Sequence, residues 1–150
     1  MRLGGLDVGK LSTNELENRI KKAKDTAQLK RILSELPDLT FSTRMEQLCR
    51  QHEVTFSQVQ VASGITKSLF YAMINGTRSA KKGHIIKIAF AMGLTLEETN
   101  ELLKLLQLKE LYAKNKEDAI VIFGLKNGLE ITQIEELLEE AGCRLRLIEG

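Results

Sequence analysis

The chain has 150 residues, of which 43% are hydrophobic and 28% are charged, and its net charge is +2. This balance excludes a mainly disordered chain, and a single proline with abundant Leu, Lys and Glu favours helix over sheet. No apolar stretch approaches the roughly 20 residues that a membrane span needs, and the first residues lack the apolar core of a signal peptide. We therefore expect an all-α, cytoplasmic protein without a membrane segment.

Residues 1–40 are expected to form a flexible N-terminal segment followed by a helical extension. Ser12 and Glu15 have the spacing of a capping box, and Asp25 and Gln28 repeat it where a second helix would begin. The chain's single proline then breaks that helix. The apolar residues of the second helix fall on one face: Leu29, Ile32, Leu33 and Leu36. Because so short a pair cannot be a domain alone, we expect this face to be buried, against the main domain or in a dimer interface.

A helix is predicted over residues 41–52, with Ser42 or Thr43 as its N-cap. Its apolar side chains recur at helical spacing and are expected to face the core. These inward side chains are Met45, Leu48 and Cys49.

The next stretch is predicted to form two short helices separated by a tight turn. Capping-box spacing at Thr55 and Gln58 marks the start of the first helix. Gly64 suits the positive φ that is needed where the chain leaves this helix, and Thr66 is the next N-cap. The second helix carries an apolar stripe and then ends at an Asn-Gly pair: Leu69, Phe70, Met73, Ile74, Asn75 and Gly76.

The sequence of residues 64–78 resembles the helix-turn-helix of lambda-repressor-like proteins, also called the Cro or XRE family, in the order G-I-T-K-S-x-F-x-x-M-x-N-G-T-R. With the flanking helices, the resemblance covers about residues 42–106. It implies a five-helix, lambda-repressor-like DNA-binding domain, which we place at residues 41–108. The chain departs from the family at three positions, where members usually carry Gln, a small residue and an acidic residue: Phe56, Gln60 and Ile74.

Two stretches in the second half of the chain form an internal sequence repeat. Residues 85–103 and 120–138 align with each other, so that Gly93 falls on Gly128. Each copy predicts a helix, a glycine stop and a second helix that packs back on the first. We therefore expect residues 109–150 to form an acidic helical hairpin and a tail. The tail alternates apolar and charged residues, and a docked coil is expected there rather than a strand paired across a dimer.

Charge is divided unevenly along the chain. Residues 54–96 carry five basic residues and no acidic one, whereas residues 97–142 carry eleven acidic residues against five basic ones. A polyanion would be attracted to the first segment and repelled by the second. The alternative is that the five cations are merely solvated.

The sequence carries no motif for catalysis, for a cofactor or for a metal, because no phosphate-binding glycine loop, nucleophile elbow or zinc spacing occurs. His52 is interpreted as a surface side chain near a helix end. His84 is interpreted as solvated, with a phosphate contact as the alternative. Cys49 and Cys143 are expected to be buried thiols rather than a disulfide. The acidic cluster at residues 135–140 is interpreted as a solvated face, and we expect a protein that is not an enzyme.

The lambda-repressor-like resemblance, with the expected exposure, implies which side chains meet DNA. The second helix of the motif would enter the major groove with five residues: Thr66, Lys67, Ser68, Tyr71 and Ala72. The loop and the helix start that follow would contact phosphates: Asn75, Thr77, Arg78, Lys81 and Lys82. The apolar run at residues 69–74 leaves three alternatives for Leu69 and Tyr71: packing on neighbouring helices, contact with DNA, or a protein interface.

The resulting hypothesis is a sequence-specific, DNA-binding transcriptional regulator of the XRE helix-turn-helix type. The family implies a homodimer on double-stranded DNA, with two half-sites about one helical turn apart. The alternative is a protein-interaction adaptor, or an antitoxin, that keeps the fold and holds a protein partner through the acidic C-terminal hairpin.

Overall fold

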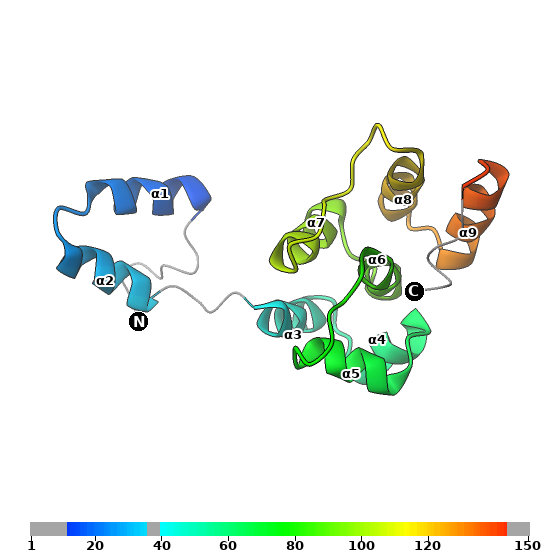
Figure 1. Ribbon diagram of the computed structural model, residues 1–150, viewed down its shortest axis with the longest axis horizontal. Coiled ribbons are helices and arrows are strands. Elements are labelled where there is room, and N and C mark those ends of the chain that lie inside the picture. Colours follow the sequence, from blue (N-terminus) through cyan, green and yellow to red (C-terminus); the bar gives the residue numbers. More distant parts are fainter. Residues whose placement is uncertain (1–11, 36–39, 144–150) are drawn as a thin grey trace. The chain divides into compact units, whose positions relative to one another are not determined.

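The computed structural model describes residues 12–35 and 40–143, and every regular element in these ranges is an α-helix (Figure 1). The expected all-α class is therefore confirmed for the described part of the chain. The chain divides into two units, residues 1–38 and residues 39–150. Several expectations lie outside the described residues, namely those for residues 1–11, Leu36, Pro37 and the tail after Cys143.

The first unit is a pair of short helices: α1 (Thr13–Lys22) and α2 (Thr26–Glu35). Both predicted starts are confirmed. The Ser12 hydroxyl accepts the Glu15 N–H, and the Glu15 carboxylate accepts the Ser12 N–H, which closes the capping box. The Asp25 carboxylate accepts the Gln28 N–H at 2.8 Å in the same way. Local hydrogen bonds therefore set where each helix of this pair begins.

The apolar face of this pair is only partly buried within the described residues of the unit. The expectation that the main domain or a dimer interface covers it stays a prediction. Ile32 is 4% exposed, but Leu33 is 52% exposed and Ile20 is 40% exposed. Successive residues of a helix point about 100° apart, so Leu33 faces away from the line of contact that buries Ile32.

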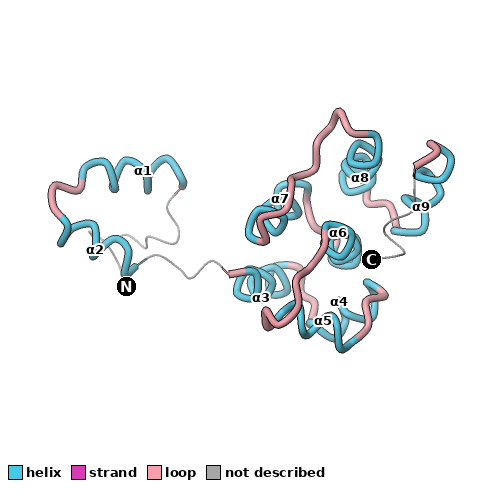
Figure 2. The backbone as a smooth tube through the Cα atoms, in the orientation of Figure 1, coloured by secondary structure: helices cyan, strands magenta, loops and turns pink. Residues whose placement is uncertain are grey.

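The second unit contains seven helices within residues 40–143 (Figure 2): α3 (Phe41–Gln51), α4 (Phe56–Ser63), α5 (Lys67–Ile74), α6 (Lys82–Met92), α7 (Leu96–Leu105), α8 (Lys116–Asn127) and α9 (Ile131–Glu140). Helix α6 lies at the centre of this unit and contacts α4, α7, α8 and α9. Six of its eleven residues are buried, as expected for a helix that is covered on several sides.

One hydrophobic core joins the helices of the second unit. The predicted inward side chains of α3 are confirmed, because Met45 and Leu48 are fully buried and Cys49 is 6% exposed. Each fully buried side chain of this size contributes about 1.5–3 kcal/mol relative to exposure. The fully buried side chains of the other core helices include Phe70, Ile85, Ile88, Leu102 and Leu103. This core fixes α4 and α5 against α3 and α6.

The N-cap of α3 is Thr40, so the prediction of Ser42 or Thr43 is wrong. The Thr40 hydroxyl accepts the Thr43 N–H at 3.1 Å, and the Thr43 hydroxyl accepts the Thr40 N–H at 3.0 Å. A threonine at the third helical position thus replaces the Glu or Gln of the usual capping box.

The C-terminal hairpin, formed by α8 and α9, packs on α6 at a glycine. A Cβ atom on Gly124 would lie 2.1 Å from Ile134 Cδ1 and 3.0 Å from Phe90 Cζ. The absence of a side chain therefore lets the three helices approach closely. Gly128 ends α8 at a φ of 63°, and Gly93 ends α6 at a φ of 70°. Both copies of the internal sequence repeat therefore fold as a helix, a glycine stop and a second helix.

Candidate nucleic-acid interface

The central stretch forms two short helices, α4 and α5, around a tight turn. The Thr55 hydroxyl accepts the Gln58 N–H at 3.1 Å, and the Thr66 hydroxyl accepts the Leu69 N–H at 3.4 Å. Gly64 follows α4 with a φ of 74°, in the left-handed region. The predicted caps and the predicted turn residue are therefore confirmed.

Gln60 braces the turn, a role that the sequence did not reveal. Its Nε2 donates to the Ile65 carbonyl at 2.7 Å. The Ser63 hydroxyl donates to the Gln60 carbonyl and accepts the Ile65 N–H. Ile65 itself is 4% exposed, so these bonds satisfy backbone groups beside a buried side chain. Gln60, one of the departures from the lambda-repressor-like pattern, thus links α4 to the turn that precedes α5.

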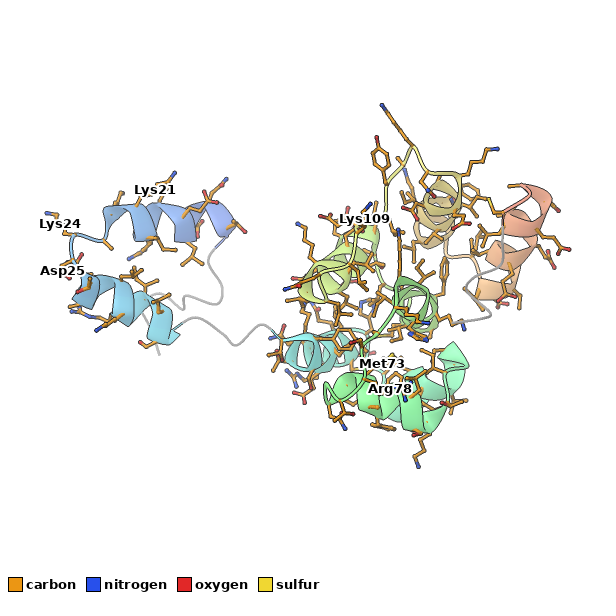
Figure 3. The ribbon with its side chains drawn as sticks, in the orientation of Figure 1. Lys21, Lys24, Asp25, Met73, Arg78 and Lys109 are labelled. Atoms are coloured by element: carbon orange, nitrogen blue, oxygen red, sulfur yellow. The ribbon has the colours of Figure 1, made fainter. Side chains whose placement is uncertain are left out.

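The inner side of α5 is held by aromatic and apolar contacts. Phe70 is fully buried and meets Phe56 edge to face, with ring centroids 6.1 Å apart. Tyr71 meets Phe70 at 5.3 Å and, like Leu69, is half-buried against the core. Met73 points into the same interior (Figure 3). Packing of Leu69 and Tyr71 on neighbouring residues of the core is therefore confirmed, and contact of either side chain with DNA or with a protein stays a prediction.

The outer side of α5 exposes polar and basic side chains. Ala72 and Tyr71 are half-buried, and the remaining candidate DNA contacts of α5 and the loop after it are exposed: Thr66, Lys67, Ser68, Asn75, Thr77 and Arg78. The exposed residues occupy the amino end of α5 and the loop that follows its carboxyl end. The structure therefore brings these predicted side chains to one short helix and its flanks.

The loop after α5 is ordered by its own side chains. The Thr77 hydroxyl donates to Asn75 Oδ1 at 2.8 Å, and the Thr77 N–H donates to the same oxygen at 3.1 Å. The Arg78 N–H donates to the Ala72 carbonyl at 3.1 Å. The side-chain amide oxygen of Asn75 is therefore occupied in shaping the loop that carries Arg78.

The two lysines at the start of α6 have different environments. Lys81 is exposed, whereas Lys82 is half-buried and its Nζ lies 3.0 Å from Asp118 Oδ2 on α8. The Asp118 carboxylate also accepts the Tyr112 N–H at 2.9 Å and is itself 7% exposed. Lys82 is therefore already paired within the chain.

A second acidic residue of the C-terminal hairpin also approaches α6. Burial lowers the pKa of the half-buried Lys87, and the charge of Glu135 on α9 partly offsets that shift. The hairpin thus partly neutralises the basic segment of the sequence on its α6 side. The basic side chains of that segment that remain exposed are Lys67, Arg78 and Lys81.

Neither histidine is the solvated side chain that the sequence predicted. His84 is 3% exposed, and its Nδ1 accepts the Lys81 N–H at 3.0 Å. His52 is half-buried, with Nε2 3.0 Å from Glu98 Oε1, and it links α3 to α7. Burial alone would raise the pKa of Glu98, but hydrogen bonds from Thr95 and His52 outweigh it and hold this pKa below its ordinary value. The prediction for His52 missed its contact with α7, which is distant in sequence.

The described residues were also compared with the requirements of a metal site, a membrane-spanning helix and a disulfide. Within residues 12–35 and 40–143, no group of three or more His, Cys, Asp or Glu side chains has the geometry to hold a metal ion. Among the same residues, no helix combines the length and the apolar character needed to cross a bilayer. Cys49 is a buried thiol whose pKa is raised by burial and, less strongly, by the charge of Glu46. Cys143 is half-buried and unbridged.

No protein-family model, curated protein or solved structure matches this chain. The resemblance to lambda-repressor-like proteins therefore rests on the residues of the turn, of α5 and of the loop after it.

Proposed function

We propose that residues 41–108 form a lambda-repressor-like helix-turn-helix domain, and that the protein is a sequence-specific, DNA-binding transcriptional regulator of the XRE type. One observation carries the proposal, namely the exposed basic face that α5 and its flanks present. Lys67 and Arg78 lie in solvent there, and residues 54–96 contain no acidic residue. A surface of this kind attracts a polyanion.

The amino end of α5 would enter the major groove of double-stranded DNA. Lys67 would donate to O6 and N7 of a guanine or to a phosphate, and Ser68 would donate or accept at a base edge. Thr66 caps the helix and would contact DNA through its exposed side. Tyr71 and Ala72 are half-buried and would add shape and apolar contact rather than specific hydrogen bonds.

The flanks of α5 would hold the DNA backbone. Thr77, Arg78 and Lys81 are exposed and can each reach a phosphate, while Asn75 orders the loop between them. Lys82 would join them only by exchanging Asp118 for a phosphate. Each charged contact releases counterions, so the logarithm of the affinity would fall with log[salt] by about 0.9 per contact.

Two copies are proposed to bind together, on half-sites about one helical turn apart. A single α5 offers few donors to base edges, so one copy would discriminate weakly between sequences. The protein would act in the cytoplasm as a non-enzymatic regulator that needs no cofactor.

The test is a gel shift of the protein with the DNA that lies upstream of its own coding sequence, at two salt concentrations. We expect binding that weakens steeply with salt and is lost in the variant Lys67→Glu/Arg78→Glu. The matched control is Lys109→Glu/Lys126→Glu, which reverses two exposed lysines of the same unit. Lys109 lies in the loop after α7, away from α5 in Figure 3. Binding that is equal in both variants, or insensitive to salt, would refute the proposal.

A protein-interaction adaptor, or an antitoxin, is the second candidate, and the acidic face of α9 favours it. Glu136, Glu139 and Glu140 are exposed on this helix. A basic protein partner would bind there, and charge reversal on α9 would abolish its capture while leaving DNA affinity unchanged.

A further inference from the structure

The first unit has too little buried surface to be stable by itself. Its helices have ten residues each, and among its described side chains only Ile32 is buried. Helices this short are marginal in water without tertiary packing, and units below about 40 residues usually need a partner, a metal or disulfides. Another surface is therefore required to cover this helix pair.

The surface that needs covering is apolar. Ile20 on α1 is 40% exposed and Leu33 on α2 is 52% exposed, and Leu16 and Leu29 are half-buried. Ile20 and Leu33 are two of the five large hydrophobic side chains that are exposed among the described residues, and both belong to the first unit. Such a surface marks a site of association.

The charges of α1 are arranged so that a second α1 would complement them. Acidic residues occupy the first half of the helix, and Arg19, Lys21 and Lys22 are the basic residues of its last turn. At about 100° per residue, Glu17 and Lys21 are the two charges that flank Ile20 on one side. An antiparallel copy would place each acidic half beside a basic half, and a two-fold axis would form both sets of contacts at once. Within the described residues, Glu17, Lys21 and Lys22 take part in no salt bridge, so their charges remain available.

Other occupants fit this surface less well. DNA would meet acidic side chains among the basic ones of α1, unlike the acid-free stretch at residues 54–96. The acidic helix α9 would match the lysines, but none of its large apolar side chains is exposed. A second copy of the same helix pair supplies both the apolar side chains and the opposite charges.

We propose that two copies of the chain associate through α1 and α2, with the two α1 helices antiparallel in a four-helix bundle. The first unit is then a dimerisation element. This dimer interface does not depend on DNA binding. For the proposed DNA-binding function, α1 and α2 form the surface through which the two copies meet.

The test is sedimentation equilibrium of the full chain in the absence of DNA. We expect the wild type to be a dimer, and Ile20→Glu/Leu33→Glu to raise the dimer dissociation constant by about a hundredfold or more, because symmetry doubles each lost contact. Phe123→Glu is the matched control, since Phe123 on α8 is 53% exposed, and it should leave the dimer intact. A monomeric wild type, or a dimer in the Ile20→Glu/Leu33→Glu variant, would overturn the proposal.

A charge exchange separates contact between copies from an effect on folding. Glu15→Gln/Glu17→Lys makes α1 basic while keeping a side chain suited to its capping box, and Lys21→Glu/Lys22→Glu makes α1 acidic. Each variant alone should dimerise at least about tenfold more weakly than the wild type, and an equimolar mixture should form heterodimers. A mixture that associates no better than its components would contradict the antiparallel arrangement. These readouts involve no DNA, so failure of the gel shift leaves them unchanged.

Discussion

The helix pairs α4–α5 and α8–α9 are built alike but present opposite charges. Each pair turns at a left-handed glycine, Gly64 or Gly128, and each packs against α6. The first pair exposes basic side chains, whereas the second exposes acidic side chains and directs Asp118 and Glu135 toward α6. The same local construction thus supports a surface that attracts a polyanion and one that repels it. The comparison also shows that the acidic pair neutralises part of the basic segment.

The largest expected effect comes from forcing α8 away from α9 and α6 at Gly124. Gly124→Val would place branched carbons where Ile134 already lies 2.1 Å from an ideal Cβ, and should lower the free energy of unfolding by about 3 kcal/mol. Urea unfolding followed by circular dichroism measures this. Ile134→Ala vacates the same space, so the double variant should lose less than the sum of the single variants by about 1 kcal/mol or more. If the losses of unfolding free energy were additive, the close contact between Gly124 and Ile134 would not be what limits stability.

The next effect concerns the ion pair between the two charged surfaces. Asp118→Asn should cost about 1–3 kcal/mol of stability, because it leaves Lys82 without its partner. It should also raise DNA affinity a few-fold, because Lys82 would then be free to make about one additional phosphate contact. The matched control is Glu117→Gln, which removes a neighbouring charge on the same turn of α8. Equal DNA affinity in Asp118→Asn and the wild type would show that Lys82 does not reach DNA.

A smaller effect is expected in the turn of the first pair. Gln60→Ala introduces the small residue that is typical of lambda-repressor-like proteins, but it removes the hydrogen bond to the Ile65 carbonyl, at a cost of about 1 kcal/mol. Gln51→Ala, at an exposed position at the end of α3, should be nearly neutral. Thermal unfolding of both variants checks this, and we expect a lower melting temperature for Gln60→Ala. Equal melting temperatures would show that the Gln60 hydrogen bond does not stabilise the turn.

The smallest effect is a dependence of stability on pH. The pKa of Glu98 is lower in the folded chain than its ordinary value of 4.5, so its ionised form favours folding. This stabilisation is present above pH 4.5 and is lost as the pH falls below that value through the folded pKa. Glu98→Gln should remove this part of the acid destabilisation, whereas Glu97→Gln should retain it. Identical acid profiles for the two variants would contradict the assignment.

The sequence predicted those features that are encoded within four residues of chain. The caps at Ser12, Thr55 and Thr66 and the glycine stops all follow from short-range hydrogen bonds and backbone sterics. The Thr40 cap was missed because a threonine can serve where Glu or Gln is usual.

The features that were missed depend on contacts between distant residues. Lys82 pairs with a residue 36 positions away and His52 with one 46 positions away, and no pattern in one sequence indicates such pairs. The candidate DNA contacts on α5 came from the resemblance to lambda-repressor-like proteins, whereas the pairing of Lys82 depends on the packing of α8 on α6. The role of Gln60 was hidden because its partner, Ile65, lies across the turn.

The most direct test is to map where α5 lies on bound DNA. An iron chelate tethered at Ser68→Cys, with Cys143→Ser to leave only the buried Cys49, would cleave DNA beside the amino end of α5. The account predicts two cleavage sites about one helical turn apart in the major groove, and none from a tether at Thr132→Cys on α9. Bound DNA that is cleaved only from α9, or from neither tether, would contradict it.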